Sequence, residues 1–297
     1  MAETHVETVR VQQTDEPVSS PWRDAWRTLR KNKLAIVGFI IIFVFVLLAL
    51  LAPYITPYEY DKGELINKNK PPSAEHWFGT DYNGRDVFTR VIYGAQISLR
   101  VGLFSVIGSV IVGTFLGLLA GYYGRWVDMI ISRLFDIMLA FPSILLAIAI
   151  VAMLGPSLEN ALLAIAIVNI PTYGRLVRSR VLSLKEEEFV MAAKAIGSKN
   201  SRIILHHILP NSLAPIIVTG TLGIATAILE AAALGFLGLG AQPPQPEWGL
   251  MLSDSRQYIQ KAPWTVIFPG LSIMLTVLGF NLIGDGLRDA LDPRMKH

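Results

Sequence analysis

The side chains that could carry out chemistry in this chain are few and scattered. His206 and His207 are the only adjacent histidines. On a helix, neighbouring side chains point about 100° apart, so this pair does not form the i, i+4 arrangement of a helical metal site. Asp128, Asp136 and Asp285 lie near the ends of apolar runs, whereas Glu230 lies well within one. The residue types therefore favour neither a metal centre nor a catalytic pair, and Glu230 is the titratable group that needs an explanation.

Asn169, Glu230 and Asn281 are polar residues inside otherwise apolar runs. An ionised carboxylate in lipid is costly, so we expect Glu230 to face the bundle interior or a water-filled path, or to be protonated. We take these three as candidate pathway or gating residues. The alternatives are that Glu230 caps nearby backbone amides and that the two asparagines form hydrogen bonds between helices.

The motifs of common enzyme classes are missing from the sequence. It has no G-x-x-x-x-G-K-[ST] phosphate loop, no H-E-x-x-H zinc motif and no G-x-S-x-G nucleophile elbow. It also has no cysteine, which excludes disulfides, iron–sulfur ligation, thiolate zinc sites and cysteine nucleophiles. We therefore predict that the chain is not an enzyme and holds no catalytic residue, cofactor or metal.

Composition identifies a membrane protein. Of 297 residues, 52% are hydrophobic and 16% are charged, and the mean hydropathy is +0.47. A bilayer core of about 30 Å needs roughly 20 apolar residues in a helix, and the sequence offers six such runs. They are residues 34–54, 99–121, 133–154, 160–179, 212–236 and 264–284. The first is too long, and too far from the start, for a secretory signal, so we expect it to be retained.

The Lys and Arg residues predict the orientation. They gather before the first run, between the fourth and fifth runs and after the sixth, and the positive-inside rule makes these regions cytoplasmic. Because they flank apolar runs instead of forming one tract, nucleic-acid binding is disfavoured. The predicted divisions are a disordered cytoplasmic tail (1–20), an interfacial helix with the first span (21–56), an external loop (57–98), a core (99–284) and a cytoplasmic tail (285–297).

Glycine and proline shape two of the predicted spans. Gly113, Gly117 and Gly121 recur at every fourth residue and leave one helix face without side chains, which allows another helix to approach closely. That helix could belong to this chain or to a second one. Pro142 and Pro171 should distort the third and fourth spans, because proline lacks the backbone N–H that a helix interior needs.

The polar insert FVMAAKAIGSKNSRIILHHILPN (189–211) reads as two short helices joined by a turn. Ser183 and Glu186 fit a capping box, so we predict a first helix that begins there and runs to Ile196. Gly197 fits the C′ position, where a positive φ ends a helix.

The second helix of the insert is predicted over RIILHHIL. Asn200 or Ser201 would cap its start, and Pro210 would stop it before the fifth span. Since Ala192, Ala193 and Gly197 leave little side-chain bulk at the turn, another protein can press closely against it. An amphipathic loop resting on lipid headgroups is the alternative.

The insert resembles the EAA loop of binding-protein-dependent ABC importer permeases, in the form of the dipeptide and oligopeptide branch. Several other long segments resemble the same branch, in the same order, and the amino-terminal region resembles the additional first-span segment of its C subunit. Together they cover most of residues 22–294. The segments are residues 78–102, 118–156, 230–252 and 279–294.

This resemblance implies an all-α membrane protein with six transmembrane helices, the type I ABC importer (MetI-like) permease fold with cytoplasmic EAA coupling helices, in a prokaryotic cell membrane. It implies a homologous second permease subunit, two cytoplasmic ATPase subunits that hold ATP and Mg²⁺, and an external solute-binding protein. The loop, within residues 182–210, would fit a groove on an ATPase. Its candidate coupling residues are Glu188, Ala192, Ala193, Gly197, Ser198, Arg202 and Pro210.

One position departs from the pattern, because Met191 replaces the glutamate that begins the motif. Glu188, one helical turn earlier, shares a face with it and is a candidate substitute. For contacts with the binding protein, the resemblance suggests residues 81–90 and 242–264.

The resemblance leaves the substrate open. Peptide uptake is the main interpretation, and glutathione, nickel chelates or oligosaccharides are alternatives within the same branch. Two further hypotheses are a stand-alone secondary transporter or channel and a membrane scaffold without transport.

Overall fold

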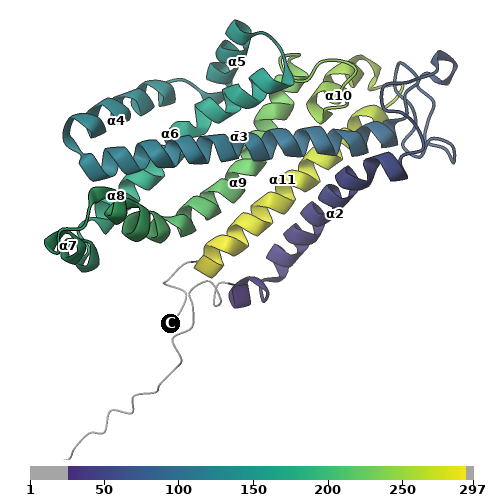
Figure 1. Cartoon of the computed structure of the whole chain (residues 1–297). Helices are drawn as coiled ribbons and strands as arrows, with labels where there is room; N and C mark the ends of the chain where they lie inside the picture. The colour runs from purple at the N-terminus through teal and green to yellow at the C-terminus, as the bar shows by residue number, and fades with distance from the viewer. Residues whose placement is uncertain (1–25, 292–297) are drawn as a thin grey trace, which may run out of the picture.

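Apolar helices make up most of residues 26–291, the part of the chain that this computed structural model describes. The predicted tail 1–20, residues 21–25 of the predicted interfacial helix and residues 292–297 lie outside that range, whereas residues 26–29 of that helix are helical. Five long helices dominate (Figure 1): α2 (Lys33–Ile55), α3 (Val87–Tyr123), α6 (Leu158–Leu184), α9 (Leu209–Phe236) and α11 (Trp264–Leu291). The shorter elements are η1 (Leu65–Asn67), α4 (Arg125–Leu139), α5 (Ser143–Leu154), α7 (Glu188–Ala195), α8 (Asn200–Arg202), the π-helix η2 (Ile203–Ile208), α10 (Trp248–Ser255) and η3 (Arg256–Tyr258).

The all-helical membrane architecture agrees with the sequence prediction. Within the described range, five helices are long and apolar enough to span a membrane, or up to six if α4 and α5 count as one broken span. A core of small and β-branched residues from α3, α5, α6 and α9 lies at the centre of the bundle. α11 and α2 pack along its side.

The second span is longer than predicted, because α3 begins at Val87 and not near residue 99. The Asp86 side chain caps it by accepting a hydrogen bond from the Thr89 N–H at 2.8 Å. The first turns contain the polar residues Thr89, Arg90 and Ser98, which lowered the hydropathy of this stretch. All three are buried by contacts with the rest of the chain.

The third span, predicted over 133–154, is broken at Pro142, the residue that was predicted to distort it. α4 and α5 meet at 93°, on either side of residues 140–142. Pro142 explains the break, since proline disfavours helical geometry in the preceding residue and supplies no N–H. Pro171, in contrast, lies inside α6, which stays continuous.

The three glycines of α3 face α6 of the same chain. A Cβ on Gly117 would lie 2.5 Å from the Gly174 carbonyl oxygen, and one on Gly113 would lie 2.8 Å from the Ile170 carbonyl oxygen. A Cβ on Gly121 would meet Val181 at 2.7 Å. Only the glycine hydrogen atoms separate the two backbones at these positions. The helices therefore pack closely, and van der Waals attraction between them stabilises the pair.

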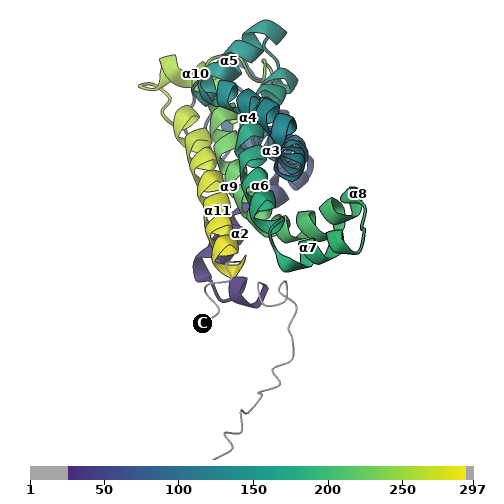
Figure 2. The same ribbon diagram turned by 90° about the vertical axis from the view of Figure 1, so that its left-hand side faces the viewer.

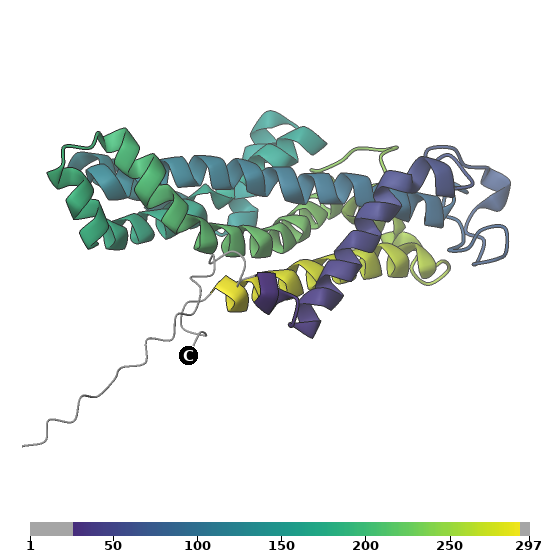
Figure 3. The ribbon, with the colours of Figure 1, turned by 60° about the horizontal axis from the view of Figure 1, so that its bottom comes forward.

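α2 is attached to the bundle through α11. A Cβ on Gly38 of α2 would lie 2.7 Å from the Gly279 carbonyl oxygen, and one on Gly279 would meet Ile42 at 2.8 Å. Figure 1 shows α2 running beside α11, and Figure 3 shows it crossing the beginning of α3. The first span is thus a packed part of the fold.

We predict that Gly117→Ala destabilises the protein, because its methyl group would collide with the Gly174 carbonyl group, which cannot rotate away. Overpacking of this kind costs about 1–3 kcal/mol. Gly108→Ala is the matched control, since its nearest neighbour would be Ala166 Cβ at an ordinary 3.5 Å. Thermal unfolding in detergent should show a lower Tm for Gly117→Ala alone. Equal Tm values for the two variants would refute the importance of this contact.

Candidate coupling segment and polar sites

The first helix of the insert begins later than predicted. α6 continues to Leu184, so Ser183 lies in its last turn and forms no capping box. α7 begins at Glu188 after Glu187, which provides no side-chain cap. α6 continues this far because Val181 and Leu184 are buried in the same apolar cluster as α7 and η2.

The turn after α7 is built as the sequence predicts. Gly197 has a φ of 77°. The Gly197 N–H donates to the Lys194 carbonyl at 3.0 Å, and the Ser198 N–H donates to the Ala193 carbonyl at 3.0 Å. This pair of bonds closes the helix end in the Schellman manner, for which glycine at C′ is preferred. A Cβ on Gly197 would meet nothing within 4 Å, so the turn is open to a partner.

The second helix of the insert does not stop at Pro210. Residues 200–236 form one continuous helical rod, in which Pro210 lies in the first turn of α9. The preceding turn, η2, is a π-helix, and the Leu209 N–H donates to the carbonyl of Ile204, five residues back. We attribute the continuity to this wider turn, which gives the proline ring room. Neither Asn200 nor Ser201 caps the second helix, because both are helical residues. Lys199 occupies the cap position and provides no side-chain cap.

The insert has an inner and an outer face. Val190, Ala193, Ile203 and Ile208 are buried against the end of α6. The remaining predicted coupling residues are exposed or half-buried on the outer side: Glu188, Ala192, Gly197, Ser198, Arg202 and Pro210. Figure 2 shows α7 and α8 standing beside the membrane helices. Of the predicted set, Ala193 therefore packs inward and is not accessible to a partner.

Tyr122, at the end of α3, also contacts the insert, and sequence reasoning missed it. Its hydroxyl donates to Asn200 Oδ1 at 2.8 Å, and Lys194 Nζ lies 5.9 Å from the centre of its ring. α3 and the turn around Gly197 are thereby connected. No local sequence signal reveals a contact between residues so far apart in the chain.

Two of the three intramembrane polar residues meet. Asn169 Nδ2 in α6 donates to Glu230 Oε2 in α9 at 2.9 Å. Asn281 lies on α11 with an exposed side chain and does not belong to this pair. Two other carboxylates are bound to α6: Arg178 Nη2 donates to Asp128 at 2.6 Å, and Arg175 to Asp136 at 2.5 Å. These ion pairs fasten α4 along α6.

The loop before α3 is held by buried polar contacts to the α9–α10 connection. Arg90 is 2% exposed and donates to the carbonyls of Tyr60 and Pro244, at 2.8 and 3.2 Å. Asp81, Arg85 and Asp86 are also buried. The predicted segments 81–90 and 242–264 therefore meet each other, and these four buried charged side chains hold the loop in place.

A titratable pair lies beside this contact. The Tyr82 hydroxyl donates to Asp254 Oδ2 at 3.2 Å. Burial raises the pKa of Asp254 above its usual range, and burial together with the neighbouring Asp254 raises the pKa of Tyr82. Both raised pKa values favour the protonated, neutral forms of Asp254 and Tyr82, as expected where water is excluded.

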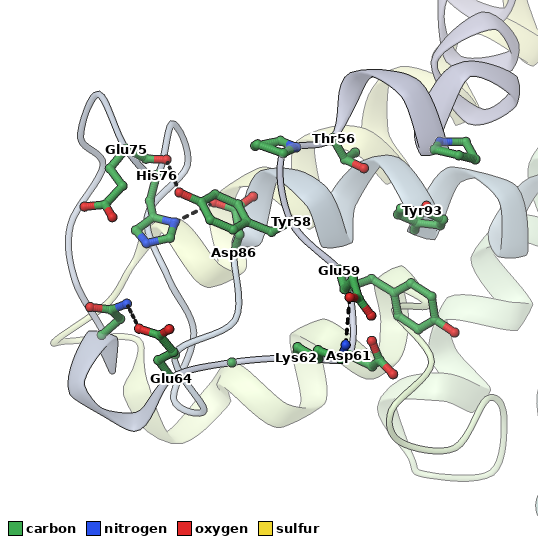
Figure 4. A pocket seen from close by; sticks show the side chains of 16 residues that line it. Thr56, Tyr58, Glu59, Asp61, Lys62, Glu64, Glu75, His76, Asp86 and Tyr93 are labelled. Carbon is green, nitrogen blue, oxygen red and sulfur yellow. Dashed lines mark hydrogen bonds and ion pairs between the residues drawn. The ribbon is translucent and has the colours of Figure 1, made fainter.

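An open pocket of about 1050 Å³ lies between this loop and the end of α2. Figure 4 shows its wall of carboxylates and tyrosines, with Lys62 bound to Glu59 and His76 bound to Asp86. The His76 Nδ1 to Asp86 Oδ1 distance is 3.0 Å. The side chains of Glu59 and Lys62 are mostly exposed, so water screens their charges.

Two protein-family models match this sequence. Residues 113–297 match the model of the binding-protein-dependent transport system inner membrane component. That match includes the coupling segment and covers more than half of the chain. The chain belongs to this permease family. Residues 20–72 also match the N-terminal transmembrane domain of oligopeptide transport permease C, so α2 lies within that additional domain of the permease.

Two curated relatives resemble this permease over nearly its whole length. It is 73% identical to the dipeptide transport system permease protein DppC of Alkalihalophilus pseudofirmus, over 93% of this chain and 91% of that one. It is 48% identical to the glutathione transport system permease protein GsiD of Escherichia coli O157:H7, over 95% of this chain and 93% of that one.

Solved structures share the fold of this permease. A chain from the inward-facing MetNI methionine ABC transporter superposes with a TM-score of 0.55 at 19% identity, covering 68% of this chain and 97% of that one. A chain from an amino acid ABC transporter gives a TM-score of 0.53 at 14% identity, covering 67% and 92%. These comparisons establish the type I importer permease fold.

We predict that Arg90→Lys loosens the loop of this permease before α3. A lysine has one nitrogen on a shorter side chain, so it does not replace both Nη1, which donates to the two carbonyls, and Nε, which lies 3.7 Å from Asp81 Oδ2, and we expect a loss of about 1–3 kcal/mol. The measurement is the rate of proteolysis between residues 56 and 86 in the purified protein. Arg100→Lys, at an exposed position of the same helix, is the control. Unchanged proteolysis in Arg90→Lys would contradict the proposed role.

Proposed function

We propose that this chain is a membrane-spanning permease subunit of an ATP-driven dipeptide importer. The observation that carries this proposal is the 73% identity to a dipeptide permease over most of both chains. The same machinery for glutathione is the second candidate, supported by 48% identity to glutathione permeases. In either case the chain forms half of the translocation path, and a homologous permease forms the other half.

We propose that this chain forms part of the membrane path and that partner subunits hydrolyse ATP. Since the sequence has no phosphate loop, ATP and Mg²⁺ would bind to two partner ATPase subunits. The outer face of α7 and the open turn at Gly197 are suited to fit a groove on such a subunit. Closure of the ATPases would push this segment, and the packed helices behind it would move as rigid bodies.

We propose that both termini are cytoplasmic. The coupling segment, the beginning of α2 and the end of α11 lie on one side of the molecule, and the loop between α2 and α3 lies at the opposite end (Figure 1). This arrangement agrees with the orientation that the positions of Lys and Arg predict. The loop would then face an external solute-binding protein.

Uptake tests the proposed function. Deletion of this subunit should abolish accumulation of radiolabelled alanylalanine in cells that have no other dipeptide importer. Restoring the chain should restore accumulation. If uptake of glutathione, and not of alanylalanine, depends on the chain, the second candidate is correct. If neither depends on it, both proposals are wrong.

We predict that Gly197→Arg uncouples ATP hydrolysis from uptake. The arginine would occupy the open turn and obstruct the ATPase, while the protein should still reach the membrane. Gly238→Arg is the matched control, because Gly238 also has a φ of 77° and open space around it, but lies after α9 and outside the coupling segment. ATP hydrolysed per alanylalanine transported should rise only in Gly197→Arg. A normal ratio in that variant would contradict docking at this turn.

A further inference from the structure

Glu230 is a carboxylate without a cation. Among residues 26–291, no Lys, Arg or His nitrogen lies within 4.0 Å of it, whereas Asp128 and Asp136, which face the same helix α6, each bind an arginine. Asn169 Nδ2 donates a hydrogen bond to it, and the Ser143 side chain lies beside it. A charge of this kind inside a membrane protein needs a partner, and unpaired ones mark ion or substrate pathways.

The side-chain amide of Asn169 adds a second hydrogen-bond acceptor beside the Glu230 carboxylate. Asn169 Nδ2 donates both to Glu230 and to the Ile165 carbonyl, at 2.9 and 3.0 Å. Its two N–H bonds are therefore used, and the amide is fixed with Oδ1 as an acceptor. Oδ1 receives no hydrogen bond from the described residues. The pair thus offers a carboxylate and a carbonyl oxygen, which together suit a ligand that carries positive charge and several donors.

The position of the pair suits a transported ligand. Asn169 lies near the middle of α6, and neither side chain is fully buried, so both remain partly accessible. Ser143, the first residue of α5, lies beside the Glu230 carboxylate, which places the pair at the break between α4 and α5. Discontinuous helices near the middle of the membrane are where transporters place substrate sites.

We propose that Glu230 and Asn169 bind the primary ammonium group of the substrate on its way through the path. This proposal rests on the function proposed above and adds a recognition site to it. An ammonium has three N–H donors and one positive charge, which match the Glu230 carboxylate and Asn169 Oδ1. The amino terminus of a peptide carries this group, as does the glutamyl residue of glutathione, and a neutral sugar does not.

Carbodiimide coupling tests the contact directly. A membrane-permeable carbodiimide converts a carboxyl group into an O-acylisourea, and a primary amine that touches it loses its proton, displaces the urea and forms an amide. In the purified, assembled transporter with alanylalanine amide, whose own carboxyl group is blocked, mass spectrometry should detect the dipeptide adduct on Glu230. Glu159, an exposed carboxylate in the first turn of α6, is the matched control and should carry far less. No adduct on Glu230, or equal adducts on both, would overturn the proposal.

Transport gives an independent measurement. Glu230→Gln keeps the shape but removes the charge, so uptake of alanylalanine should fall at least about tenfold, as expected for loss of a charge-assisted hydrogen bond. Glu159→Gln should retain wild-type uptake. Wild-type uptake in Glu230→Gln would overturn the proposal and leave the proposed function intact. Loss of the second permease from purified Glu230→Gln complexes would overturn it too, by assigning Glu230 to the subunit interface.

Discussion

The close approach of α3 and α6 is the contact on which the rest of the structure depends. Three glycines bring the two backbones together, and Ser109 Oγ adds a hydrogen bond to the Ala166 carbonyl at 2.8 Å. Because these helices are joined along much of their length, Tyr122 at the end of α3 reaches the coupling segment. The same contact places Asn169 of α6 where α9 brings Glu230. A looser pair of helices would separate the coupling segment from the path.

Much of the fold follows from local sequence patterns. Apolar runs of the right length predict the membrane helices, and residues 99–121, for example, all lie within α3. Gly197 is predictable because glycine adopts the positive φ that ends α7 at the lowest cost. The glycine face of α3 is also visible in the sequence, whereas its partner helix is not, since a small-residue face fits a helix of the same chain or of another.

The remaining features depend on contacts that local patterns do not contain. Arg90 lies in a helix because the Pro244 carbonyl, 154 residues away, accepts its hydrogen bond and allows the charge to be buried. The continuous helix through Pro210 follows a π-turn that no propensity predicts. Asn169 and Glu230 are both recognisable as polar residues in apolar runs, but only the packing of α6 on α9 shows that they form one site.

We propose that a rigid set of helices joins two sites, the coupling segment, where an ATPase would supply the energy, and the Asn169–Glu230 pair, where the substrate would be recognised. The central part of this proposal is that an ATPase subunit binds the outer face of α7. The chain has no cysteine, so Ile196→Cys, at an 81% exposed position, introduces a single thiol. A thiol-to-amine cross-linker in the assembled transporter should join it to the ATPase, and Ile66→Cys, 84% exposed in the loop before α3, should not. Cross-linking from Ile66→Cys alone, or from neither, would contradict the account.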